Sequence, residues 1–370
     1  AEAIAGASAE TLASLAERLL LQTPAPGRYA IHRLIHQFTV ARLTAPASPD
    51  DRSPLLQDRH SAYYLGWLAQ REDSLQKRRL TRALAEIQTE WRHIQQAWEW
   101  AADNRQGERL QRTANALAHY LALRGRYQTG ERLFERAAAA LAAAVPTSLA
   151  ADEVDGLVGA LARGQMLMHQ ARFLNLQDDR SRLAAVADAG RDQFEQLLSL
   201  AEAEGISELT IASLSNLGSI ATLQGDYVTA RRRLEAALEL CEQMGEPVIE
   251  AGILSDLGAV LMLYGDYAAA RNYLEQSQQT HRQNGDRLGE GVASFNLGRV
   301  ADAVGLYAEA QACFEQALRI AQGLGDERLE AQTLAAHALM AHHMGDHNTA
   351  WELSDRAAQL AAAANNLPVE

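Results

Sequence analysis

The spacing of apolar residues and glycines in the C-terminal half of the chain predicts pairs of amphipathic helices. From about residue 207 onward the same pattern recurs every 40 positions. The first unit predicts one helix over 208–223 and a second over 227–243, because apolar residues recur there at helical spacing. Gly225 separates the two segments, and glycine accepts the left-handed conformation that commonly ends a helix. Asp226 can then cap the free amides of the second helix.

This unit keeps one register through four consecutive copies. Gly218 lies inside the first helix, where glycine costs about 0.5–1 kcal/mol relative to alanine. Its recurrence at one position therefore predicts that a neighbouring helix approaches closely there, with Leu234, Leu274 and Phe314 filling the space between helices. The recurring residues are Gly225-Asp226-Tyr227, Gly265-Asp266-Tyr267, Gly305-Leu306-Tyr307 and Gly345-Asp346-His347, then Leu217-Gly218, Leu257-Gly258 and Leu297-Gly298, and finally Ala230, Ala270, Ala310 and Ala350.

These features resemble the tetratricopeptide repeat, whose usual unit has about 34 residues. The 40-residue unit here implies a longer second helix or following loop, and the closing proline of the usual repeat is absent. The resemblance covers 207–366. It implies an all-α fold, a tetratricopeptide-like α-α superhelix (solenoid) in which stacked helix pairs form a concave surface.

Weaker versions of the unit precede the regular array. We expect helix pairs over 106–124 with 128–143 and over 151–174 with 180–204, and Gly125-Arg126-Tyr127 repeats the glycine–tyrosine corner. The domain organisation that follows is a winged-helix end over 1–45, a linker and helical connector over 46–105, degenerate tetratricopeptide-like helix pairs over 106–206, and four 40-residue repeats over 207–370.

The connector is expected to hold two long amphipathic helices, over 54–71 and 77–102. Aromatic residues recur in both at helical spacing, which is more often a core than a cofactor-binding feature. We interpret them as core residues: Tyr63, Tyr64, Trp91, Trp98 and Trp100.

The first 45 residues predict a helix, a hairpin and a second helix. Thr11–Leu21 predicts a helix that runs into a short strand, and prolines at 24 and 26 with Gly27 predict a turn. Tyr29-Ala30-Ile31 predicts the second strand, and His32–Leu43 predicts the closing helix. This order is typical of the end of a winged-helix domain.

The segment Gly27–Phe38 resembles the end of the winged helix in STAND-type signalling ATPases, which include NB-ARC proteins and bacterial regulators related to MalT and AfsR. That family carries a Met-His-Asp motif here, whose histidine contacts ADP. The resemblance implies that His32 is a nucleotide contact in a full-length protein only. Ile31 replaces the methionine and Arg33 replaces the aspartate. The resemblance also implies that ADP or ATP is bound by an upstream domain, and we expect no cofactor in this chain.

The composition of the chain argues against several classes of binding partner. The formal net charge of −13 repels phosphate backbones, so we expect no nucleic-acid partner. Only two cysteines occur, Cys241 and Cys313, which fits a reducing cytoplasm better than a disulfide framework. We find no apolar run near the roughly 20 residues of a membrane span. No signal-peptide pattern is present, and the start at Ala1 suggests a fragment of a longer protein.

The motif search predicts that the chain is not an enzyme. No G-x-x-x-x-G-K-[ST] phosphate-binding loop, no G-x-S-x-G elbow and no H-E-x-x-H metal motif occurs. Four histidines gather around the last repeat, but their spacing does not favour joint ligation, and we predict no metal site. These residues are His337, His342, His343 and His347.

A partner-binding groove is the remaining candidate site. Helical positions three and four apart share a face, and the repeat register places one such face toward the concave side of the superhelix. Aromatic, Arg and Met residues are enriched in interfaces. The predicted groove residues are Ser215, Ser219, Thr222, Ser255, Ala259, Met262, Phe295, Arg299, Asp302, Ala335, Leu339 and His342. The alternative for Phe295 is a core position, and for Arg299 an ordinary surface charge.

The sequence therefore predicts a sensor and protein-interaction module of a STAND signalling ATPase. A protein or peptide trigger would bind in the superhelical groove and control the chain's own upstream nucleotide-binding domain. Two alternatives remain: a free-standing tetratricopeptide scaffold or peptide receptor, and a DNA-binding transcriptional regulator acting through residues 1–45. Neither a membrane nor nucleic acid is an expected partner of the main function.

Overall fold

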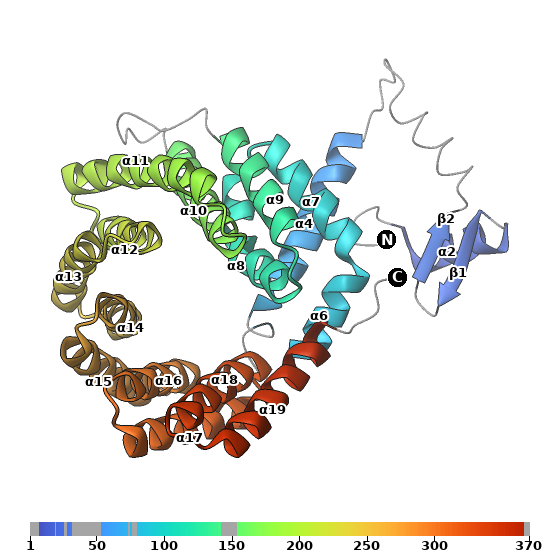
Figure 1. Cartoon of the computed structure of the whole chain (residues 1–370). Helices are drawn as coiled ribbons and strands as arrows, with labels where there is room; N and C mark the ends of the chain where they lie inside the picture. The colour runs from blue at the N-terminus through green and yellow to red at the C-terminus, as the bar shows by residue number, and fades with distance from the viewer. Residues whose placement is uncertain are drawn as a thin grey trace.

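The fold is an array of paired helices that curves into a ring (Figure 1). The computed structural model describes residues 7–18, 20–25, 28–31, 53–72, 75, 80–141 and 154–365. The elements are α2 (Ala9–Glu17), β1 (Leu21–Ala25), β2 (Arg28–Ile31), α4 (Ser53–Ala69), α6 (Leu80–Thr89), α7 (Trp91–Asp103), α8 (Gly107–Leu123), α9 (Tyr127–Ala140), α10 (Val154–Leu176), α11 (Arg180–Glu204), α12 (Ser207–Gln224), α13 (Tyr227–Met244), α14 (Pro247–Tyr264), α15 (Tyr267–Gln283), α16 (Arg287–Ala303), α17 (Tyr307–Leu324), α18 (Glu327–His343) and α19 (His347–Asn365).

The helix pairs of the regular array follow the predicted boundaries to within a residue or two. α12 and α13 form the first 40-residue unit, and α14 to α19 form the next three. Glycines with positive φ lie at the turns between consecutive helices and recur every 20 residues from Gly205 to Gly345. At Gly225, φ is +79°, a left-handed conformation that glycine adopts without steric cost. Asp226 accepts a hydrogen bond from the Thr229 amide at 3.0 Å, which confirms the predicted cap.

The predicted close approach at the recurring glycine is confirmed. A Cβ atom on Gly218 would lie 2.7 Å from Leu234 Cγ, and one on Gly258 would lie 2.4 Å from Leu274 Cγ. In the next unit Phe314 occupies the same place. The side chain of the second helix therefore inserts against the bare backbone of the first, and a methyl group there would collide with it.

The helix pair before the regular array uses the same packing. A Cβ atom on Gly164 of α10 would lie 2.7 Å from the Phe194 ring of α11. Gly130 of α9 similarly faces the Phe173 ring of α10, at 2.5 Å from Cζ. The degenerate pairs therefore belong to the same stack, and the aromatic residue Trp98 of the connector is fully buried in their core, as predicted.

Two predictions about the N-terminal part need correction or limitation. The single helix predicted over 77–102 is wrong in the described part, because α6 ends at Thr89 and α7 begins at Trp91. Glu90 leaves the helical region with ψ of 8°, and the Thr89 hydroxyl donates to the Ala85 carbonyl, an interaction that commonly bends helices.

The hairpin predicted near the N-terminus is present. β1 and β2 pair antiparallel, with Leu21 opposite Ile31, and α2 packs against β1. The predicted closing helix His32–Leu43, and with it His32, lies outside the described residues. The winged-helix end and its nucleotide contact therefore stay predictions.

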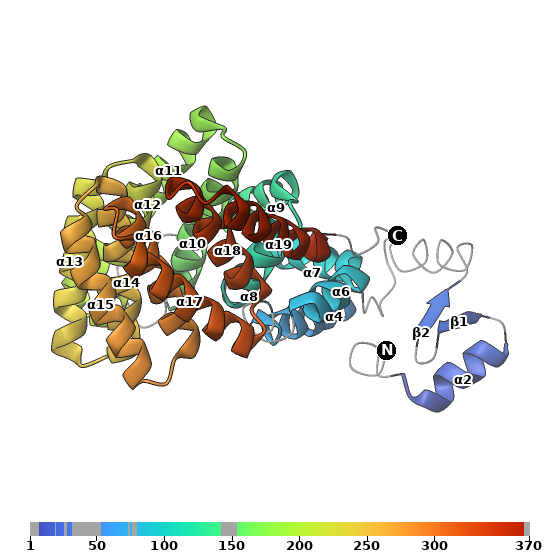
Figure 2. The same cartoon turned by 60° about the horizontal axis from the view of Figure 1, so that its bottom comes forward.

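The last repeat returns to the first helices of the array. α19 packs against α6, which closes the ring, and both views show the two helices side by side (Figures 1 and 2). The first helix of each repeat lies on the inner side of the ring and the second on the outer side (Figure 1). Residues that are more than 150 positions apart in sequence therefore face a common interior.

One helix in the described part of the chain, α14, is long and apolar enough to cross a membrane by length and composition alone, with a mean hydropathy of 1.5. It stands in the middle of the array, where it packs against α13, α15 and α16. Leu254, Leu257 and Leu261 are buried in that packing. This helix is an exception to the expectation that no apolar run approaches the length of a membrane span, and apolar side chains at its two ends are exposed, among them Val248 and Tyr264.

Replacing Gly258 by alanine tests the close packing. The new methyl group would displace Leu274, and such overpacking costs about 1–3 kcal/mol. We expect a lower midpoint in urea denaturation followed by circular dichroism. Gly252 lies in the same helix with no atom within 4 Å of its Cβ position, so Gly252→Ala is the matched control and should stabilise by about 0.5–1 kcal/mol through helix propensity. Equal effects of the two substitutions would contradict the packing argument.

A candidate binding site where the ring closes

Some residues of the predicted groove pack between consecutive repeats. Met262 packs against the apolar cluster that contains Leu297 of the next repeat. Phe295 packs against the cluster of Phe314, as the core alternative predicted, and Arg299 stacks over its ring at 5.7 Å. Ser255 is hydrogen-bonded to Ser277 at 3.0 Å. Asp302 lies 3.1 Å from the ring of His343 in the next repeat.

The remaining predicted positions differ in their exposure. Ser215, Ser219, Thr222 and Ala259 are half-buried. Ala335, Leu339 and His342 are exposed, and they line a shallow cavity between α18 and α19. Trp351, three-quarters exposed, borders the same cavity. No further repeat follows α19 in the described residues, so the face that is covered in earlier repeats is open here.

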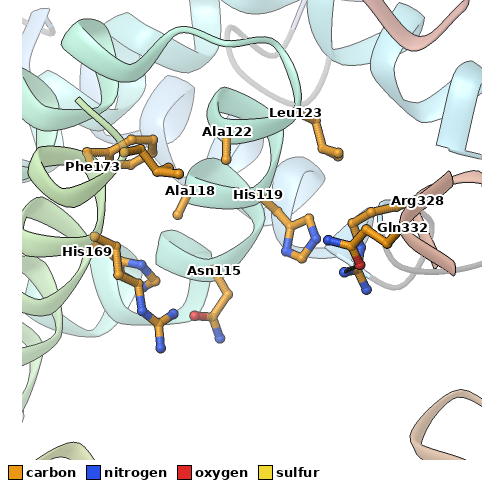
Figure 3. A pocket seen from close by; sticks show the side chains of 11 residues that line it. Asn115, Ala118, His119, Ala122, Leu123, His169, Phe173, Arg328 and Gln332 are labelled. Carbon is orange, nitrogen blue, oxygen red and sulfur yellow. Dashed lines mark hydrogen bonds between the residues drawn. The ribbon is translucent and has the colours of Figure 1, made fainter. Parts of the chain in front are cut away.

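A larger cavity lies where the two ends of the array meet. Its volume is about 540 Å³, within the range of about 300–1,000 Å³ that is typical of ligand pockets. α8, α10 and α18 contribute its walls, and Figure 3 shows the side chains of His119, His169 and Arg328 around one opening. The lining residues are Asn115, Ala118, His119, Ala122, Leu123, His169, Arg172, Phe173, Leu176, Arg328 and Gln332.

The two histidines of this cavity are held neutral. Burial lowers the pKa of His169 to about 3, and the positive charge of Arg172 acts in the same direction. Burial also lowers the pKa of His119 to about 4, assisted by Arg328 and Arg172. A neutral imidazole has one N–H donor and one acceptor, so both rings can hydrogen-bond a ligand without a net charge of their own.

Arg172 faces Asp256 across the interior of the ring. Both side chains remain accessible to water, but the surrounding helices enclose them. This enclosure raises the pKa of Asp256 to about 6, against the opposing effect of Arg172. It lowers the pKa of Arg172, against the opposing effect of Asp256. The two groups therefore influence each other's protonation although both side chains are exposed.

The hydrogen-bonding capacity of Arg328 is only partly used. Its Nη1 donates to Gln332 Oε1 at 3.1 Å, one helical turn away. Its Nε is buried without a hydrogen-bond acceptor. Among the described residues no carboxylate forms an ion pair with it, and none of those lining the cavity is acidic. The cavity thus has donors and positive charge in excess of acceptors.

Sequence analysis did not identify this group of residues. Gln332 lies three residues before the predicted Ala335, which is about 60° around the helix. The predicted face was therefore close to the inner surface in the last repeat but rotated away from it. His119, His169 and Arg172 have no sequence signal that links them to Arg328, because only the closure of the ring brings them together.

Among the described residues, no group of three or more His, Cys, Asp or Glu side chains is placed so that it could hold a metal ion. The histidines near the last repeat instead contact single neighbours. His337 stacks on Phe314 with ring centroids 5.7 Å apart, and His342 lies 5.2 Å from His347. Cys241 and Cys313 are free thiols.

Family patterns match the regular array. Residues 210–244 and 250–323 each match a tetratricopeptide repeat. The chain carries tetratricopeptide repeats. No curated protein sequence matches it. The matched segments contain the recurring Leu-Gly and Gly-Asp-Tyr residues that the sequence analysis used.

Solved structures share this fold at low sequence identity. A Signal Transduction ATPase with Numerous Domains (STAND) protein with a tetratricopeptide repeat sensor, from Pyrococcus horikoshii, has a TM-score of 0.50 at 13% identity, over 96% of this chain and 53% of that one. A Rap protein complexed with Competence and Sporulation Factor has a TM-score of 0.49 at 13% identity, over 90% and 92%. BtubC from P. vanneervenii has a TM-score of 0.47 at 17% identity, over 66% and 94%. At these identities the likeness concerns the fold alone.

The neutral state of His169 can be tested by NMR of imidazole-labelled protein. The side chain is 4% exposed, and we expect its ring to remain unprotonated at pH 5, since the pKa is lowered to about 3. His169→Asn assigns the signal. A titration midpoint above pH 5 would contradict the enclosed environment.

The lowered pKa of His169 also makes the stability of the fold depend on pH. In the unfolded chain the His169 ring takes up a proton near pH 6.5, whereas in the folded protein it does so only near pH 3. The contribution of the neutral ring to the free energy of unfolding is therefore complete above pH 6.5 and is lost as the pH falls toward 3. Asp256 acts oppositely, because its folded pKa of about 6 exceeds the unfolded value of 3.8, and acidification through this window favours the folded state. The ring signal is therefore a cleaner measurement than the global stability.

Proposed function

We propose that this chain is a sensor module that binds a protein or peptide trigger on the inner surface of its helical ring. The observation that carries the proposal is the tetratricopeptide array itself, matched over 210–244 and 250–323 and curved so that the first helices face inward. Tetratricopeptide repeats form extended concave binding surfaces. Arg172 and Asp256 are exposed side chains of opposite charge on inner helices of the ring, and charge complementarity of this kind contributes to specific recognition.

We further propose that the module belongs to a STAND-type signalling ATPase in the cytoplasm. Three features support this: the α2–β1–β2 unit ahead of the array, the resemblance of residues 27–38 to the end of a winged helix, and the fold shared with a STAND protein that has a tetratricopeptide repeat sensor. Nucleotide would then be bound by an upstream domain. Trigger binding would shift the equilibrium between two arrangements of the array relative to that domain, provided that the trigger binds one arrangement better.

Peptide selection tests the binding surface. Peptides selected from a random display library against the full chain should bind the inner surface. Asp256→Asn removes one inner charge with little change of shape, and we expect it to weaken such peptides by up to about fivefold, because an exposed ion pair contributes up to about 1 kcal/mol. Isothermal titration calorimetry measures the dissociation constants.

The control for this experiment is Arg319→Gln. Arg319 is exposed on the outer helix α17, where its nearest ion-pair partner is Glu315 at 3.9 Å. It should leave the affinity unchanged. If the selected peptides bound wild type and Asp256→Asn equally but lost affinity with Arg319→Gln, the outer surface would be the docking face and the proposal would be wrong.

The absence of a phosphate-binding loop predicts that this chain alone does not bind ATP. A calorimetric titration with Mg-ATP should give only the heat of dilution. Micromolar affinity would place the nucleotide site within the chain and contradict its assignment to an upstream domain.

A further inference from the structure

The cavity at the closure of the ring has the composition of a small-molecule site. α8 and α10 contribute His119, His169 and Arg172, while α18 contributes Arg328 and Gln332. Phe173, Leu123 and Leu176 form apolar parts of the same wall. Ligand pockets commonly combine an apolar lining with a few convergent polar groups, and these polar groups come from helices far apart in the sequence.

The charge balance indicates the sign of the ligand. Arg172 and Arg328 contribute two guanidinium groups, and Asp256, beyond the lining, is the one described carboxylate that offsets Arg172. Arg328 has a buried Nε without an acceptor. His169, 4% exposed, lines the cavity, and its described contact is the Phe134 ring. A buried donor such as Arg328 Nε is costly unless an acceptor meets it.

We propose that this cavity binds a small organic anion, with its carboxylate or phosphate group between Arg172 and Arg328 and its apolar body against Phe173 and Leu176. Guanidinium groups match both oxyanions with paired N–H donors. The neutral rings of His119 and His169 can add a hydrogen bond each. The cavity shares Arg172 with the inner surface proposed for the peptide trigger, whereas His119, Arg328 and Gln332 belong to the cavity lining. The two proposals are therefore tested at different residues, Asp256 for the trigger and Arg328 for the anion.

Ligand binding at this place would hold the ring closed. The cavity is complete only while α18 lies next to α8 and α10, so an anion that contacts both sides binds the closed ring better than an opened one. A ligand shifts such an equilibrium by its differential affinity for the two states. The same site therefore connects a small metabolite to the shape of the whole array.

Calorimetric titration of the full chain with benzoate, benzamide and inorganic phosphate tests this proposal. Benzoate and benzamide have nearly the same shape and differ in charge. We expect saturable binding of benzoate and at least about tenfold weaker binding of benzamide, as for loss of a charge-assisted contact. The phosphate titration decides which oxyanion the site prefers.

Two variants locate the binding. Arg328→Gln removes the unpaired guanidinium and should abolish benzoate binding. Gln332→Glu places a carboxylate one turn from Arg328, on an exposed position where folding is not at risk. This built-in anion should compete with the ligand and reduce its affinity by a similar factor. Arg319→Gln, on the outer surface, should bind as wild type does.

Hydrogen–deuterium exchange supplies a readout that charge removal alone would not change. Benzoate should slow exchange of the α18 and α8 amides in wild type and not in Gln332→Glu. Saturable phosphate binding that Arg328→Gln abolishes would support the site with phosphate as its ligand. Equal affinity for benzoate and benzamide, unchanged affinity in both variants, or no anion binding at all would overturn the proposal.

Discussion

The insertion of one large side chain against a glycine is the contact on which the whole array depends. In the first three regular units the first helix exposes bare backbone, at Gly218, Gly258 or Gly298, and the second helix places Leu234, Leu274 or Phe314 directly on it. Interiors are close-packed, so this approach fixes the distance and angle between the helices. Repetition of one local geometry then adds a constant rotation per repeat, and the constant rotation produces the curvature.

Because the array curves over many repeats, its two ends meet. The array turns until α19 meets α6, and α18 approaches α8 and α10. This approach places Arg328 of α18 in one cavity lining with His119 and His169, whose pKa values are lowered by burial.

The two candidate surfaces differ in how they arise. The predicted groove residues follow the repeat register, and some of them pack between neighbouring repeats, as Met262 and Phe295 do. Others are exposed, among them Arg299 and, in the last repeat, Ala335 and Leu339. The closure cavity follows no register, because it joins the start of the array to its end.

Spacing alone determined the helices, their corners and their pairing in the regular array, since glycine at a helix end and glycine beneath a leucine are local requirements with local sequence signals. The break of the connector helix at Glu90 escaped prediction, because it depends on a single backbone deviation. The closure cavity was decided by tertiary structure. The rotation between neighbouring repeats is a small angle that is set by side-chain packing. The total rotation over all repeats brings Arg328 next to His119, and no single segment of the sequence determines that total.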